Sequence, residues 1–120
     1  MRRGPADEAE IRAVIEAQLG AFRSGDAEAA YAWASPAIRT KFGTPDGFLT
    51  MVRMAYEPLL NPAEVLWLQL VDRFGHVCQT GMVTDQHGLT WTAYWLMIRY
   101  PGVGWRTNGV LLEPLRLPEA

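Results

Sequence analysis

In the first half of the chain, apolar and polar residues alternate with the period of a helix. One apolar stripe consists of Ile11, Val14, Ile15, Leu19 and Phe22. Residues three or four positions apart share one helix face, so the stripe predicts an amphipathic helix. Asp7 and Glu10 have the spacing of a capping box before it, with Asp in place of the usual Ser or Thr. Gly25 is suited to end this helix in a left-handed conformation.

Three further helical segments are predicted before residue 64. Asp26 is placed to cap a helix over residues 27–34, which is rich in alanine. A Ser or Thr followed by Pro is typical of a helix start, because Pro fits the first helical position. Two such pairs occur, at Ser35-Pro36 and Thr44-Pro45. Pro58 and Pro62 end the helical region.

From Glu64 onward the apolar period changes to two, which indicates β-strands. Four strands are predicted, at residues 64–72, 76–84, 89–100 and 105–113. Turn-forming stretches of four residues separate them and favour hairpins. Helices followed by an antiparallel meander indicate an α+β fold. The length of 120 residues predicts one domain over residues 1–120, with its core at about 7–113.

If each four-residue turn closes symmetrically, the strand residues sort onto two faces of the sheet. The face predicted to meet the helices holds Leu66, Leu68, Leu70, Val77, Gln79, Val83, Tyr94, Leu96, Ile98, Trp105, Thr107 and Leu111. The opposite face is predicted to carry a tryptophan- and methionine-rich set, residue types that are enriched at protein interfaces. We therefore predict a homodimer interface through Trp67, Met82, Trp91, Trp95 and Met97. A one-residue bulge would change this order locally.

Charge and composition narrow the classes of partner. The net charge is −2 and no basic run reaches five residues, which disfavours binding to nucleic acid or to a membrane surface. No uncharged apolar run approaches the ~20 residues of a membrane span. The single cysteine, Cys78, cannot form an internal disulfide, which favours a cytoplasmic location. No signal peptide is expected after Arg2 and Arg3, although a start site chosen too late would hide one.

Several segments resemble a known superfamily. The helix IRAVIEAQLGAF at 11–22, the SGD that follows at 24–26, and GWRTNGV at 104–110 are similar to the opening and closing elements of the nuclear transport factor 2-like superfamily. The segments ASPAI at 34–38 and FLTMV at 48–52 resemble a bacterial branch described as a domain of unknown function. The resemblance covers about residues 7–113.

This resemblance implies a cone, in which N-terminal helices pack on the concave face of a strongly bent antiparallel sheet. Members of the superfamily are often dimeric through the sheet. They include polyketide cyclases, ketosteroid isomerase, dehydratases and non-catalytic binding proteins, so the fold alone does not choose a function.

The isomerases and cyclases need a carboxylate or histidine base inside the cone, together with an oxyanion-stabilising group. The predicted helix-facing strand positions offer no Asp, Glu or His, and we predict no catalytic residue. The predicted pocket residues are Tyr31, Tyr56, Gln79, Tyr94 and Thr107. Tyr94 and Gln79 are expected to face each other. They would either orient a ligand or form the hydrogen bond that a buried tyrosine hydroxyl requires.

Metal and cofactor sites are not predicted. No cluster of His, Cys and carboxylate residues has metal-ligand spacing, and no nucleotide-binding motif occurs. Cys78 is interpreted as a small buried apolar residue. A role as a nucleophile would need a base, for which His76 is the candidate.

The sequence favours a cytoplasmic homodimer that binds a small apolar ligand in its cone, or that has an accessory role. Two alternatives stay open. One is a lyase, cyclase or isomerase that works through Tyr94, Tyr31, Gln79 and a bound water. The other is a protein-interaction module whose cone is filled by side chains.

Overall fold

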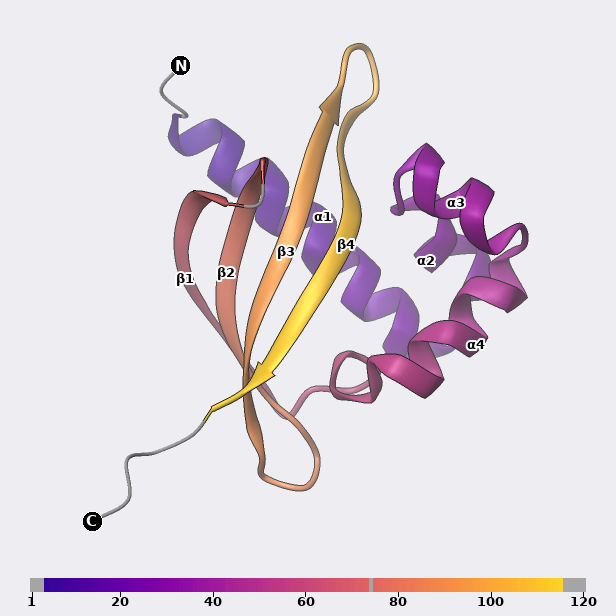
Figure 1. Ribbon diagram of the computed structural model, residues 1–120, viewed down its shortest axis with the longest axis vertical. Coiled ribbons are helices and arrows are strands. Elements are labelled where there is room, and N and C mark those ends of the chain that lie inside the picture. Colours follow the sequence, from indigo (N-terminus) through magenta and orange to yellow (C-terminus); the bar gives the residue numbers. More distant parts are fainter. Residues whose placement is uncertain (1–3, 74, 116–120) are drawn as a thin grey trace.

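The computed structural model describes residues 4–73 and 75–115. The helical elements are α1 (Pro5–Ser24), α2 (Ala27–Ala32), α3 (Pro36–Phe42), α4 (Pro45–Ala55) and the short 3-10 helix η1 (Glu57–Leu59). The strands are β1 (Glu64–Arg73), β2 (His76–Thr84), β3 (Thr90–Tyr100) and β4 (Gly104–Pro114) (Figure 1). They form one antiparallel sheet in the order β1-β2-β3-β4. The α+β prediction is confirmed. None of the helices in the described part is both long and apolar enough to cross a membrane.

Local capping determines where the helices begin and end. Gly25 ends α1 with a φ of 71°, and its N–H reaches the carbonyl oxygens of the last turn. Three side chains then cap the following helices by accepting a hydrogen bond from a backbone N–H three residues ahead. They are Asp26, Ser35 and Thr44. All four positions agree with the prediction. The start of α1 does not, because Pro5 opens the helix and Asp7 already lies in its first turn.

The connection between β2 and β3 is one residue longer than predicted. Thr84 pairs with Thr90, so five residues lie between the two strands. The Asp85 carboxylate closes this loop by accepting hydrogen bonds from the N–H of His87 at 2.9 Å and of Leu89 at 3.0 Å. It also accepts one from Trp91 Nε1 at 3.1 Å. The Trp91 hydrogen bond contributes most to holding the pKa of Asp85 below its ordinary value, and the backbone N–H groups add to it.

The longer loop reverses the face on which each β3 side chain lies, because successive strand residues point to opposite sides. Gln79 pairs with Trp95, and Tyr94 pairs with Thr80. The predicted pairing of Gln79 with Tyr94 is therefore wrong.

Two bulges shift the register again. One lies in β1 between Trp67 and Leu70. The other lies in β4, because Met97 pairs with Thr107 whereas its neighbour Leu96 pairs with Gly109. The second bulge leaves Asn108 as the extra residue.

The predicted division of the sheet into two faces is consequently wrong at many positions. Trp95 and Met97, assigned to a partner interface, are each 1% exposed and belong to the core. Trp67 packs against the same core, and Trp91 lies on the same side as Val83 by its pairing. Of the five predicted interface residues, Met82 alone lies on the opposite face, which we call the outer face. The leucines there are exposed instead: Leu66 by 51%, Leu68 by 42% and Leu111 by 40%.

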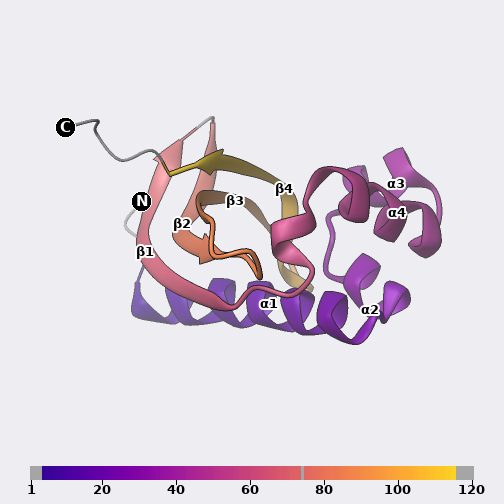
Figure 2. The ribbon, with the colours of Figure 1, turned by 90° about the horizontal axis from the view of Figure 1, so that it is seen from below.

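The core joins α1 to the inner side of the sheet. Ile11 and Ile15 of α1 are fully buried and belong to one cluster with Val83, Trp95 and Met97. Figure 2 shows α1 running along the curved strands. The Trp95 ring lies over Gly81, where an added Cβ would stand only 3.1 Å from a ring carbon. A glycine at this position therefore makes room for the largest side chain in the core.

A buried amide ties α1 to the bulge in β1. Gln79 is fully buried, and its Nε2 donates to the carbonyl oxygens of Leu68 at 3.0 Å and Thr80 at 2.8 Å. Arg12 of α1 donates to Gln79 Oε1 at 3.4 Å and to the Leu68 carbonyl oxygen at 3.3 Å. Buried polar groups need such partners, so these bonds keep the bulge carbonyl satisfied beside the core.

Replacing Trp95 with Ala should lower the free energy of unfolding by about 3–5 kcal/mol, because the change leaves a large cavity in the core. The control is Leu89→Ala in the β2–β3 loop, where the side chain is 59% exposed. The control should stay within about 0.5 kcal/mol of the parent protein. Urea unfolding measures both. A Trp95→Ala protein of near-parental stability would contradict the core assignment.

Candidate functional site

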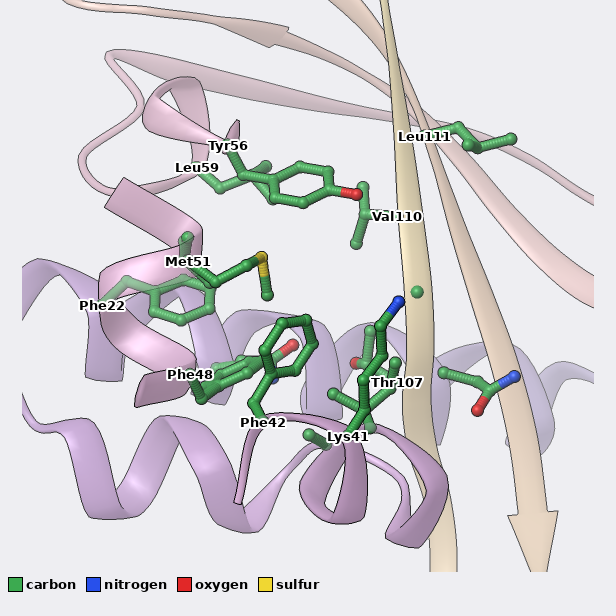
Figure 3. A pocket seen from close by; sticks show the side chains of 16 residues that line it. Phe22, Lys41, Phe42, Phe48, Met51, Tyr56, Leu59, Thr107, Val110 and Leu111 are labelled. Carbon is green, nitrogen blue, oxygen red and sulfur yellow. The ribbon is translucent and has the colours of Figure 1, made fainter. Parts of the chain in front are cut away.

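A cavity of about 270 Å³ lies between the helices and the last strand (Figure 3). Ligand pockets typically have volumes of about 300–1,000 Å³, so this one suits a small molecule. Most of its lining is apolar. The residues are Gln18 and Phe22 of α1, Ala34, Ile38, Lys41 and Phe42 in and beside α3, Phe48, Met51 and Val52 of α4, Tyr56 and Leu59 in and beside η1, and Thr107, Asn108, Gly109, Val110 and Leu111 of β4.

Backbone pairing fixes β4 beside the segment that joins α2 to α3. Ala34 and Thr107 form a parallel β-bridge. The N–H of Ser35 donates to the Thr107 carbonyl oxygen at 2.8 Å, and the N–H of Thr107 donates to the Trp33 carbonyl oxygen at 3.0 Å. Ser35 is fully buried, and its hydroxyl donates to Asn108 Oδ1 at 2.6 Å while capping α3. These contacts hold one side of the cavity in place.

Aromatic rings form the side of the cavity that faces α4. The Phe48 ring lies centrally, with its centroid 6.1 Å from that of Phe22, 5.9 Å from that of Tyr31 and 6.2 Å from that of Phe42. All three pairs are tilted, a geometry that aromatic rings prefer. The thioether of Met51 and the hydroxyl of Tyr56 extend from the same side into the cavity (Figure 3).

One polar atom in the cavity lining stands out. Thr107 is 5% exposed, and its Oγ1 is buried without a hydrogen-bond partner. Leaving a buried donor or acceptor unpaired costs about 1–3 kcal/mol, so such groups are rare in folded proteins. By contrast, the buried Gln18 donates to the Ala30 carbonyl oxygen at 3.0 Å. The Thr107 hydroxyl is therefore a buried polar group beside the cavity whose hydrogen-bonding capacity is unused.

The charge in the lining comes from one side chain. Lys41 is exposed, and its Nζ lies 5.5 Å from the centroid of the Phe42 ring. Among the described residues that line the cavity, none is Asp, Glu, His or Cys. The described part of the chain also has no group of three or more potential metal ligands. The lining residues thus offer apolar contact, hydroxyl and amide groups, and one ammonium group.

The structure brings together two of the five predicted pocket residues, Tyr56 and Thr107. Tyr31 lies beside a separate open hollow, and its hydroxyl donates to the Arg39 carbonyl oxygen at 2.7 Å. Gln79 is engaged with Arg12 and the β1 bulge.

Tyr94 lies on the outer face, where the guanidinium carbon of Arg73 is 4.7 Å from its ring centroid. The set of Tyr94, Tyr31 and Gln79 on which the enzymatic alternative depended is therefore not assembled.

Sequence reasoning missed several residues that line the cavity. Phe48, Met51 and Val52 lie three or four positions apart on α4, so helical spacing in the sequence could have placed them on one face. Lys41 carries no signal in the sequence, because an exposed lysine near a helix end is usually a solvated residue. Its position at the cavity depends on how α3 lies against β4.

Cys78 lies away from the cavity, buried within β2. Burial raises the pKa of its thiol, and the nearby positive charge of Arg73 opposes this effect more weakly. The neutral thiol is thus favoured, as expected of a small buried apolar residue.

Residues 5–120 match the model of a family described as a domain of unknown function, DUF4864. The chain therefore belongs to this family. No curated protein and no solved structure matches the chain.

The Thr107→Val variant tests the unpaired hydroxyl. Because Val has nearly the same shape, the variant should be as stable as the parent protein or gain about 1 kcal/mol. Ser35→Ala is the matched comparison and should lose about 0.5–2 kcal/mol, since it removes a helix cap. Urea unfolding of the ligand-free proteins distinguishes them. A Thr107→Val variant that loses more than Ser35→Ala would show that the hydroxyl is already paired.

Proposed function

We propose that this protein binds a small, largely apolar molecule in the cavity between α1, α3, α4 and β4. It would act as a ligand-binding or accessory protein. The observation that carries the proposal is the unpaired, buried hydroxyl of Thr107 in a cavity that is otherwise mostly apolar. An empty apolar cavity needs no polar group, whereas a binding site uses a few placed polar groups to orient its ligand.

Burial supplies enough free energy for such binding. A ligand that removes roughly 200 Å² of apolar surface from water gains about 5 kcal/mol at ~25 cal/mol per Å². The loss of translational and rotational freedom offsets part of this gain. Weak to moderate affinity is therefore expected from the apolar contacts, and polar contacts would add selectivity.

The cavity also bears on the two alternatives. A protein-interaction module with a filled interior is disfavoured, because a volume of about 270 Å³ is left between the helices and β4. For the enzymatic alternative, the described lining supplies hydroxyl groups and an ammonium group, and no side-chain carboxylate or imidazole. Binding is the function that this set of groups supports best.

The same features support a place in the nuclear transport factor 2-like superfamily, with the cone that this implies. Helices come first, four antiparallel strands follow, and the strands curve strongly in Figure 2. The cavity lies where helices and sheet meet, which suits a cone that is open to a ligand. A cytoplasmic location is part of this proposal, because the single cysteine is a buried free thiol.

Filling the cavity should abolish binding. Met51→Trp places a larger side chain in the space between Phe48 and β4, and affinity for octan-1-ol should fall at least about tenfold, since the apolar contact area is lost. Met54→Trp on the same helix is the control, because Met54 is 83% exposed and does not line the cavity. Calorimetric titration measures both affinities. Equal octan-1-ol binding by the two variants would exclude the cavity as the site.

The outer face supports self-association. Leu66 and Leu68 are exposed on it, and neither packs against the core cluster. We propose that two copies stack through this face around a two-fold axis, as antiparallel sheets commonly do. The predicted tryptophan interface is replaced by these leucines, because the tryptophans lie on the inner side.

Leu68→Arg should then shift the sedimentation mass toward that of a monomer, because a charge would be buried between the copies. Leu89→Arg in the exposed β2–β3 loop is the control and should leave the mass unchanged. A parent protein that already sediments as a monomer at micromolar concentration would overturn the dimer.

A further inference from the structure

We infer that the ligand is an amphipathic anion, with a small apolar body and a single carboxylate held between Lys41 and Thr107. This inference rests on the proposed function and assigns a chemical class to the molecule in the same cavity. It follows from the charge of the lining, from the side on which its polar groups lie, and from the hydrogen-bonding needs of Thr107.

Among the described residues that line the cavity, one side chain is positively charged and none is negatively charged. Lys41 is the one charged side chain among the described residues that surround the cavity. Its Nζ lies over the Phe42 ring at 5.5 Å from the centroid, at the edge of the apolar space. An anion entering there meets an attractive charge, whereas a cation is repelled and a neutral molecule gains nothing from it. Charge therefore selects among ligands that the apolar lining would otherwise accept equally.

The buried hydroxyl and the ammonium group lie on the same side of the cavity. In Figure 3, Thr107 and the ammonium end of Lys41 lie beside β4, while Phe48 and Met51 lie on the side of α4. A ligand with its charge at one end and its apolar body at the other fits this division. A molecule that is polar at both ends would place a polar group against the aromatic rings, at a desolvation cost.

The Thr107 hydroxyl explains why the head group should carry oxygen acceptors. Its Oγ1 has no partner, and Thr107 is 95% buried, its exposure being 5%. Because Oγ1 is itself covered in the ligand-free protein, the ligand must first separate the side chains around it. A carboxylate oxygen then accepts a hydrogen bond from this hydroxyl, and the second oxygen remains available to the ammonium group of Lys41. Hydrogen bonds to a charged acceptor are about twice as strong as neutral ones. One carboxylate thus satisfies the buried hydroxyl and pairs the lysine at the same time.

Three probes with the same alkyl chain test the inference: octanoate, octan-1-ol and octylammonium. Calorimetric titration at neutral pH should give the tightest binding for octanoate, by about tenfold over octan-1-ol, because a hydrogen bond to a charged group adds to the apolar contacts. Octylammonium should bind most weakly. The advantage of octanoate should shrink as salt is raised, because the exposed charge of Lys41 is screened.

Substitutions at Lys41 and Thr107 test whether these residues cause the preference for octanoate. Lys41→Glu should reverse the order of the charged probes, so that octylammonium binds more tightly than octanoate. Arg53→Glu makes the same charge change at an exposed position of α4 that does not line the cavity, and it should leave the order unchanged. Thr107→Val should lower octanoate affinity about tenfold or more through the lost hydrogen bond.

The outcomes separate this inference from the proposed function. If octan-1-ol binds as tightly as octanoate, and the Lys41→Glu variant keeps the same order of probes, the anionic class is wrong while binding in the cavity stands. If none of the three probes binds, and Met51→Trp changes nothing, the proposed function itself is wrong.

Discussion

The rest of the structure depends on the pairing of one short inter-helix segment with β4. The backbone of residues 33–35 donates to and accepts from Thr107, in a parallel bridge that has no continuation on either side. Buried N–H and C=O groups are costly to leave unpaired, so these two bonds fix the distance between the helical half and the strand. The buried Ser35 hydroxyl adds a third link, to Asn108. These bonds help to set the separation of the two sides of the cavity.

Thr107 combines two roles that reinforce each other. Its backbone is held by the bridge, and its buried side-chain hydroxyl has no hydrogen-bond partner. A hydroxyl on a fixed strand loses little freedom when a ligand binds, which is the advantage of placing a polar group on a rigid element. Under the proposed function, a ligand that pairs this hydroxyl would recover the free energy that the unpaired atom costs the ligand-free protein.

The sequence predicted the helical half well and the sheet faces poorly, for a physical reason. Helix ends depend on contacts between residues that are close in sequence. Capping residues such as Gly25, Asp26 and Ser35 therefore indicate where a helix begins or ends. Which way a strand side chain points depends on the exact length of the preceding loop. Asp85 closes a loop of five residues where four were expected. The one additional loop residue places the Trp95 side chain in the core, whereas the four-residue loop would have placed it on the outer face. Turn-forming composition indicates that a loop exists, but its length follows from hydrogen bonds that composition does not reveal.

The bulge in β4 explains why Thr107 and Val110 both line the cavity. In a regular strand, Thr107 and Val110 would point to opposite faces, because they are separated by an odd number of positions. The extra residue at the bulge brings both onto the cavity side. Gly109 makes the bulge possible, since its φ of 152° is one that residues with a side chain rarely adopt. Thr107 and Tyr56 were predicted as pocket residues, yet the wall that joins Thr107 to Val110 depends on a backbone irregularity that strand periodicity does not encode. The position of the site thus follows from two departures from regular structure, an isolated bridge and a bulge, both on the edge strand that faces the helices.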